Sequence, residues 1–209
     1  MGATKTKSLY DVHPGVAMVQ KWVDELKAKT GKSLEEWVAL TKKEGPKGEI
    51  ERREWLKIQH KLRTNSTWWI AERAEGKGGD EDSPEAYLKA AARYVEEQYA
   101  GPKGKLRPIY DRLLELGKKT GGDVKACPCK TMVPLYRNHV FAQIKPTTNS
   151  RVDLGFALVK YKGKLPKRMV DTGGLAKKDR ITHRIEITLA GEIDEEVKKW
   201  LKTAYDLDA

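Results

Sequence analysis

Apolar residues in the first third of the chain recur at helical spacing. Within the stretch 14–30, Val16, Val19, Val23 and Leu26 lie three or four positions apart, a period that places them on one face of a helix. Gly31 follows as a natural stop. The same pattern predicts three more short helices, over 33–43, 51–62 and 65–75.

Capping residues support these helices. Ser33 precedes Glu36 by three positions, the arrangement of a capping box. Asn65 is a good N-cap for the fourth helix. After the glycine-rich segment EGKGGDEDSP, Ser83 is a cap and Pro84 opens a helix that reaches about Tyr99. A further helix is expected over 107–119, before TGGD.

The first segment also holds five of the six tryptophans, as expected of a small bundle that buries much area with few residues. Trp68 and Trp69 are adjacent, so their side chains point about 100° apart on a helix. We expect both to pack within the helical module. Truncating the more buried one to alanine should cost about 3 to 5 kcal/mol.

Beyond residue 120 the apolar period changes from helical spacing to two. Alternation predicts strands over 140–145 and 151–158, joined by a hairpin at KPTTNS. Segments 123–130 and 131–137 are weaker strand candidates, because Pro128 and Pro134 suggest edges or bulges. A last strand over 181–189 has Ile181, His183, Ile185, Ile187 and Leu189 on its inward side, and an amphipathic helix follows over 194–205.

This order of elements predicts the α+β class. The expected organisation is an N-terminal helical module over 1–76, a linker over 77–84, and an α+β module over 85–209. That second module would combine two helices, a mainly antiparallel sheet and a C-terminal helix.

Composition and charge limit the classes of partner that we expect the protein to bind. The net charge of +11 and the isoelectric point near 9.5 favour polyanions such as nucleic acid. No apolar run of about 18 residues and no secretory leader is recognised, so we expect a cytoplasmic protein without a membrane partner. Two cysteines, Cys127 and Cys129, exclude an ordinary disulfide framework.

Positive charge is concentrated on the strand region. From residue 123 to residue 188, 14 Lys and Arg stand against 5 Asp and Glu, a net of +9, whereas residues 189–209 have 3 against 6, a net of −3. A sheet face with arginine forks and lysine point charges could grip phosphates. The candidate ligand-binding residues are Arg137, Lys145, Asn149, Arg151, Lys177, Lys178, Arg180, His183 and Arg184.

The plainer interpretation of this set is a solvated strand face. The loop DTGGLAKKDR favours a ligand slightly, because its glycines let the backbone approach one and its Lys and Arg add charge. The loop matches neither a P-loop nor a GxGxxG motif. His183 lies in register with aliphatic side chains, so it is either a core histidine or a ligand or acid–base residue. The nearest strand carboxylate, Asp153, has no evident partner.

The pair CPC raises a metal hypothesis. Cys127 and Cys129 with His139 or His183 could bind a soft metal, yet structural zinc sites have wider cysteine spacing. Inert, packed thiols are the alternative, since the pair lacks the helix N-terminus that activates CxxC thiols. No catalytic constellation is recognisable, and neither a metal nor a cofactor is predicted.

Three long stretches carry a family resemblance: TGKSLEEWVAL, WLKIQHKLRTNSTWWIAERA, and DVKACPCKTMVPLYRNHVFAQIKPTTNSRVDLGFAL with DTGGLAKKDRITHRIEI after it. They resemble a bacterial family of uncharacterised proteins that joins an N-terminal helical domain of unknown function to a C-terminal α+β domain of unknown function. The resemblance implies that the C-terminal module also occurs next to nucleases and carries a loose label as a predicted transport protein. It implies the architecture and no settled activity.

The leading functional hypothesis is a non-catalytic module that binds DNA, RNA or another polyanion. The first alternative is a small-molecule binding protein with a pocket between the sheet and the C-terminal helix. The second is an enzyme centred on His183 or Cys127. The oligomeric state is left open by the sequence.

Overall fold

The computed structural model describes residues 8–209, and the chain forms two compact units. The first, here called the helical unit, spans His13–Lys89. The second, here called the sheet unit, combines residues 8–12 with Ala90–Ala209. The boundary falls within a helix, α5 (Pro84–Gln98), which follows the glycine-rich segment.

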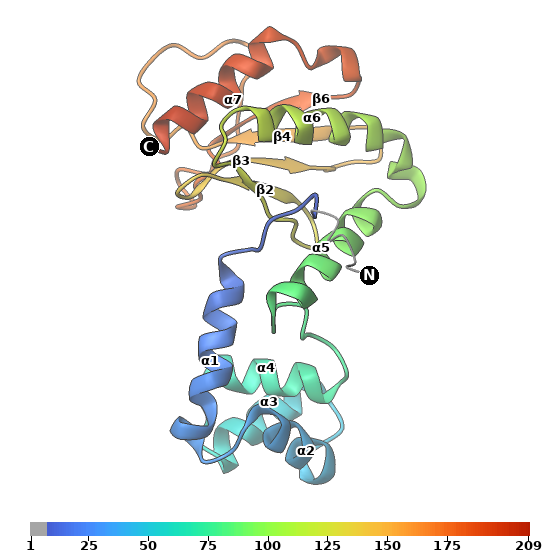
Figure 1. The fold of residues 1–209 in the computed structure, drawn as a ribbon, viewed down its shortest axis with the longest axis vertical. Coiled ribbons are helices and arrows are strands. Elements are labelled where there is room, and N and C mark those ends of the chain that lie inside the picture. Colours follow the sequence, from blue (N-terminus) through green and yellow to red (C-terminus); the bar gives the residue numbers. More distant parts are fainter. Residues whose placement is uncertain (1–7) are drawn as a thin grey trace, which may run out of the picture. The chain divides into compact units, whose positions relative to one another are not determined.

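The helical unit contains four short helices (Figure 1). They are α1 (Gly15–Thr30), α2 (Leu34–Glu44), α3 (Glu49–Gln59) and α4 (Thr64–Ala74). The capping box at α2 is confirmed, because Glu36 N donates to Ser33 Oγ and Ser33 N donates to Glu36 Oε2. The expected cap at Asn65 is wrong: Thr67 N donates to Arg63 O, so the helix begins earlier and Asn65 lies in its first turn.

One apolar cluster holds this unit together. Its buried members come from all four helices and the turn before α4, with partly buried Trp22 and Trp55 packed around them. The buried members are Leu26, Leu34, Trp37, Leu56, Leu62, Ile70 and Ala71.

The adjacent tryptophans take different roles. Trp69 is half-buried, and its ring lies 4.5 Å from that of Trp22 in an edge-on arrangement. Trp68 is 54% exposed and stacks under the guanidinium of Arg53, 4.4 Å from the ring centre. Trp68 therefore does not pack in the core as expected, because Ile70 fills the buried side of α4 and the 100° step turns Trp68 outward.

The sheet unit is built on six antiparallel strands in the order β1-β2-β3-β4-β6-β5. The strands are β1 (Lys125–Ala126), β2 (Val133–Tyr136), β3 (Val140–Lys145), β4 (Val152–Phe156), β5 (Val170–Asp171) and β6 (His183–Ile187). Its other elements are the end of α5, α6 (Arg107–Lys119), α7 (Glu195–Leu207) and two 3₁₀ turns, η1 (Gly101–Leu106) and η2 (Ala190–Glu192). The α+β class predicted from the sequence is confirmed.

Helices α6 and α7 pack against the apolar side of this sheet (Figure 1). Leu135, Ile144 and Leu154 share that side and are fully buried. The approach of α6 is close: a side chain on Gly117 would come within 2.5 Å of Leu135 Cδ1. Glycine at this position lets the helix lie directly on the strand.

The register explains where the simple alternation fails. The β2–β3 pairing slips between Leu135 and Tyr136, which leaves Phe141 as an extra residue in β3. Both Phe141 and Ala142 are therefore buried, although strict alternation would turn only one of two neighbouring strand residues inward. Leu189, expected on the inward side of the last strand, lies beyond β6 and is 66% exposed.

No helix within residues 8–209 has both the length and the apolar character that crossing a bilayer requires.

Replacing Trp69 by alanine should lower the free energy of unfolding by about 3 kcal/mol, because the cavity between α1 and α4 cannot fully close. Trp68→Ala is the matched control and should cost about 1 kcal/mol or less, since it removes one exposed cation–π contact. Urea unfolding followed by far-ultraviolet circular dichroism measures both. Equal destabilisation by the two variants would contradict this packing.

Candidate functional site

Period two divides the sheet into a buried apolar side and a charged side, here called the open face. Lys145, Asp153 and Glu186 are paired across β3, β4 and β6 and share this face. Gln143, Gly155 and Arg184 form the neighbouring row. Three of the candidate residues predicted from the sequence, Lys145, Arg151 and Arg184, thus come together around this face.

The arginines of the open face are occupied by carboxylates of the same chain. Arg151 Nε lies 2.8 Å from Asp153 Oδ1, and Arg151 Nη1 lies 3.0 Å from Glu186 Oε1. Arg184 Nη2 lies 2.9 Å from the same Glu186 oxygen, and Arg184 Nε lies 3.5 Å from Asp153 Oδ2. Asp153 also accepts a hydrogen bond from Thr147 Oγ1 at 2.8 Å. Two arginines and two carboxylates therefore form one neutral network.

Asp153 is the buried member of that network. It is 8% exposed, whereas the side chains of Arg151, Arg184 and Glu186 retain between 25% and 37% of their exposure. An isolated carboxylate at such a position would be strongly unfavourable. The two guanidinium groups are thus required to balance Asp153, which makes their first role structural.

Arg137 and Arg180 are also engaged, at the end of α7. Arg180 Nη2 lies 2.8 Å from Asp208 Oδ1. Arg137 Nη1 donates to Tyr205 O at 3.2 Å, and its guanidinium lies 4.2 Å from the Tyr205 ring centre. Cations at a helix C-terminus are stabilising. These two arginines therefore anchor the C-terminal helix.

The remaining candidates are scattered. Lys177 and Lys178 are exposed in a turn whose backbone bonds close on Gly174 and Leu175. His183 lies on the opposite side of the sheet from Arg184, because successive strand residues alternate. Its Nδ1 is 2.9 Å from Thr182 Oγ1, and it is partly buried. His183 and Arg184 therefore do not meet on one face of the sheet.

A second basic feature lies beside the open face and is named here the lysine pocket. It has a volume of about 550 Å³ and brings together three lysines from separate segments: Lys103 of η1, Lys130 of the β1–β2 connection and Lys145 at the end of β3. One carboxylate, Glu97, lines it. Its other lining residues are Gln98, Ala100, Pro102, Thr131, Pro146, Thr147 and Asn149.

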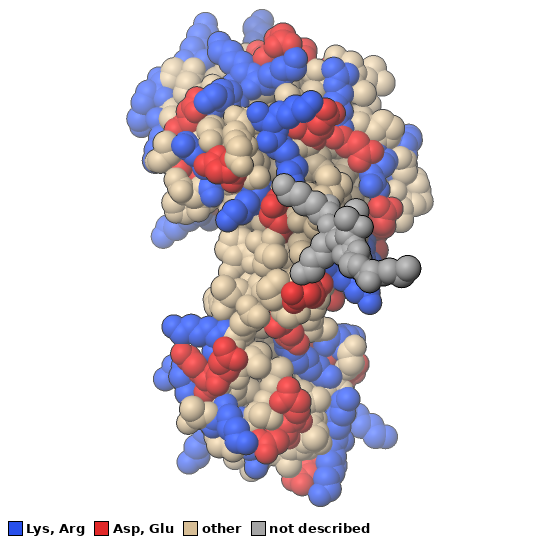
Figure 2. All heavy atoms as spheres, viewed as in Figure 1, with Lys and Arg blue, Asp and Glu red and all other residues tan. Residues whose placement is uncertain are grey.

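The lysines of this pocket differ from the arginines of the open face. Lys103 Nζ donates to the backbone oxygen of Pro146 at 2.7 Å, which fixes η1 against the β3–β4 connection. Within residues 8–209, neither Lys130 nor Lys145 forms an ion pair. On the face drawn in Figure 2, Lys and Arg are interspersed with Asp and Glu in both units. The lysine pocket therefore differs from the open face, because its three lysines converge around only one carboxylate.

Gln98 gives the pocket a directional polar group. The residue is 6% exposed, and its Nε2 donates to Cys129 O at 2.7 Å. Its Oε1 is buried and accepts no hydrogen bond from the described residues. Buried acceptors are normally paired. Because that oxygen is itself buried, the Gln98 side chain would have to move before a ligand in the pocket could reach it.

Of the residues in this pocket, the sequence predicts Lys145 and Asn149 as ligand-binding but not Lys103, Lys130 or Gln98. Lys103 lies in AGPKGK, which predicts only a break between helices, and Lys130 follows the CPC pair. Their meeting depends on the pairing of β1, β2 and β3, which a single sequence does not specify.

Cys127 is buried, and Cys129 is half-buried. Burial raises the pKa of the Cys127 thiol to about 12, and its Sγ lies 3.7 Å from the backbone oxygen of Val12. A thiol with a raised pKa is a poor nucleophile and a poor metal ligand near neutral pH. Over the described range 8–209, no three His, Cys, Asp or Glu side chains are grouped to hold a metal ion.

The alternative pocket between the sheet and the C-terminal helix corresponds to a small cavity. It has a volume of about 180 Å³, is lined by Lys160, Arg180, Leu207 and Asp208 among others, and does not include His183 or Arg184. Ligand pockets commonly measure about 300 to 1,000 Å³. The lysine pocket falls within that range.

The fold and these sites define an α+β domain with helices on one side of an antiparallel sheet and a paired charge network on the other. Residues 95–208 match the family described as Domain of unknown function (DUF5655). The chain belongs to this family. The match covers all six strands, α6, α7 and every residue of the lysine pocket, and begins after the helical unit.

The family match supports the C-terminal part of the resemblance noted in the sequence and does not extend to an N-terminal domain or to an origin. No curated protein and no solved structure matches the chain.

Asp153→Ala should lower the free energy of unfolding by about 2 to 3 kcal/mol, because it leaves two partly buried guanidinium groups without their shared carboxylate. Glu186→Ala, which removes the more exposed carboxylate of the network, should cost about 1 kcal/mol or less. Urea unfolding measured by circular dichroism compares them. A smaller effect of Asp153→Ala than of Glu186→Ala would contradict the structural role of the buried pair.

Proposed function

We propose that the sheet unit is a non-catalytic binding module for nucleic acid and that the lysine pocket holds part of the phosphate backbone. The supporting observation is the convergence of Lys103, Lys130 and Lys145 on one pocket with a single carboxylate. Lysine ammonium groups act as point charges that bind phosphates without reading bases. The pocket thus accounts for backbone affinity and predicts little sequence preference.

The polar side chains that line the pocket beside its lysines favour nucleic acid over a bare polyanion. Inorganic polyphosphate offers few donors at neutral pH, whereas bases present N–H groups and ribose presents a 2′-hydroxyl. Thr131, Thr147 and Asn149 add further polar groups at the rim.

This proposal differs from the sequence-based hypothesis in the residues that carry it. The charge pattern predicts that Arg151 and Arg184 grip phosphates, yet both are paired with Asp153 and Glu186. Recruiting them to a ligand would break those pairs and leave Asp153 uncompensated. Binding a ligand through Lys130 and Lys145 breaks no ion pair within the described residues.

A binding role also fits the chemistry of the pocket. Its lining residues include no histidine and no cysteine, the side chains that most often act as base and nucleophile. A reducing, cytoplasmic location is part of the proposal, since Cys127 and Cys129 are both free thiols.

A small phosphorylated ligand is the second candidate, because a volume of about 550 Å³ also suits a molecule of nucleotide size. Competition by a mononucleotide separates the two. A free nucleotide that displaces an oligonucleotide at micromolar concentration would favour the small ligand, whereas displacement only at millimolar concentration supports the polymer.

Fluorescence anisotropy of labelled DNA and RNA oligonucleotides, single-stranded and duplex, should reveal binding that weakens steeply between about 50 and 200 mM salt. Lys130→Ala combined with Lys145→Ala should reduce the log–log salt slope by about 0.7 to 0.9 for each phosphate that the variant no longer neutralises. Lys162→Ala combined with Lys164→Ala is the matched control, because both residues are exposed, lie outside the pocket and remove the same charge.

Absence of binding at the lower salt concentration would refute the proposal. So would a salt slope that is equally reduced in the pocket variant and in its control, since net charge alone would then explain the affinity.

A further inference from the structure

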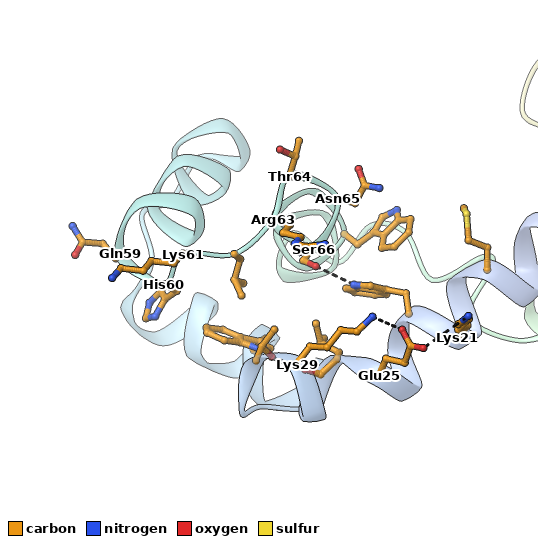
Figure 3. Close-up of a pocket in the computed structure, with 17 residues that line it drawn as sticks. Lys21, Glu25, Lys29, Gln59, His60, Lys61, Arg63, Thr64, Asn65 and Ser66 are labelled. Carbon is orange, nitrogen blue, oxygen red and sulfur yellow. Dashed lines mark hydrogen bonds and ion pairs between the residues drawn. The ribbon is translucent and has the colours of Figure 1, made fainter.

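A wide groove in the helical unit is separate from the lysine pocket and lies outside the family match. It has a volume of about 1,260 Å³ and runs between α1 and the connection from α3 to α4 (Figure 3). It exceeds the range of about 300 to 1,000 Å³ that is usual for small-molecule pockets. Its size suits a segment of an extended ligand.

The groove has an aromatic floor. Trp22 and Trp69, both half-buried, and the buried Trp37 line it together with Leu26 and Leu62. Two of the indole N–H groups are used inside the unit: Trp22 Nε1 donates to Ser66 Oγ at 3.0 Å, and Trp37 Nε1 donates to Thr30 Oγ1 at 2.7 Å. These bonds fix the orientation of both rings. What Trp22 offers a ligand is therefore the exposed part of its ring and not a donor.

The rim is basic. Lys21 and Lys29 on α1 flank Glu25, which pairs with both (Figure 3). Lys61 and Arg63 lie across the groove, are exposed, and form no ion pair among the described residues. Four cations against one carboxylate give the rim a net charge of +3. An anionic ligand is thus favoured.

Polar side chains lie between the charges. Gln59, Thr64, Asn65 and Ser66 line the same side as Lys61 and Arg63. Amide and hydroxyl groups can donate to and accept from base edges. An aromatic floor, a cationic rim and amide side chains between them form the combination by which proteins bind single strands.

We propose that this groove binds single-stranded nucleic acid, with bases against Trp22 and Trp69 and phosphates near Lys61 and Arg63. The proposal rests on the proposed function and deepens it by naming the form of nucleic acid and a second surface. A duplex fits less well, because its bases are stacked on each other and cannot reach the tryptophans. An acidic peptide would match the charge but brings no planar bases.

The test uses the full chain and three probes of equal length and charge: oligo(dT), an abasic oligonucleotide, and poly-glutamate. Binding is measured by anisotropy for wild type, for the groove variant Lys61→Ala/Arg63→Ala, and for Lys42→Ala/Lys57→Ala. The last pair is the matched control, since both residues are exposed in the same unit and neither lines the groove. Circular dichroism verifies that the variants fold.

Wild type should bind oligo(dT) at least about fivefold more tightly than the abasic strand, the difference expected for one stacked base. The groove variant should weaken oligo(dT) binding more than the control does. Equal affinity for oligo(dT), the abasic strand and poly-glutamate would overturn the inference, because charge alone would then explain binding. So would equal effects of the groove variant and its control.

The pocket variant Lys130→Ala/Lys145→Ala separates this inference from the proposed function. If only the groove variant weakens oligo(dT) binding, the groove is supported and the lysine pocket is not. If only the pocket variant does, the proposed function stands and the groove inference fails. If oligo(dT) does not bind at all, both fail.

Discussion

The burial of Asp153 is the constraint on which the open face of the sheet depends. A carboxylate that is 8% exposed must be balanced by cations. Arg151 and Arg184 supply them, and Thr147 adds a hydrogen bond. The strand register sets this arrangement, since pairing of Lys145, Asp153 and Glu186 across three strands brings the acids and bases to one side.

The arginines and the lysines of the sheet unit therefore have different roles. The arginines have rigid forks that suit carboxylates, and four of the candidate arginines hold carboxylates or the end of α7. Lys130 and Lys145 remain without an ion pair in the described part of the chain, beside a buried acceptor on Gln98. A high net charge alone therefore overstates the surface available to a polyanion, and the lysine pocket is a place in the sheet unit where unpaired lysines converge.

Local signals predicted much of the fold. Helical period, the Ser33 capping box, and Ser83 with Pro84 placed the helices within a few residues, and alternation found β3, β4 and β6. The bulge at Phe141 and the two-residue strand β5 escaped detection, because they depend on pairing with other strands, whereas β1 and β2 fall within the weaker candidates 123–130 and 131–137. The same limit applies to the candidate site. The charge pattern identified the basic region. The pairing of Asp153 with two arginines, and the proximity of Lys103, Lys130 and Lys145, depend on tertiary structure.

Lysine footprinting tests most directly whether the lysines, and not the arginine network, contact nucleic acid. The full chain would be acetylated with and without a saturating oligonucleotide, and each site quantified by mass spectrometry. We expect protection of Lys130 and Lys145, with Lys162, Lys164, Lys177 and Lys178 modified as in the free protein. Unchanged acetylation of Lys130 and Lys145 in the complex, or equal protection of all six, would contradict a nucleic-acid site at the lysine pocket.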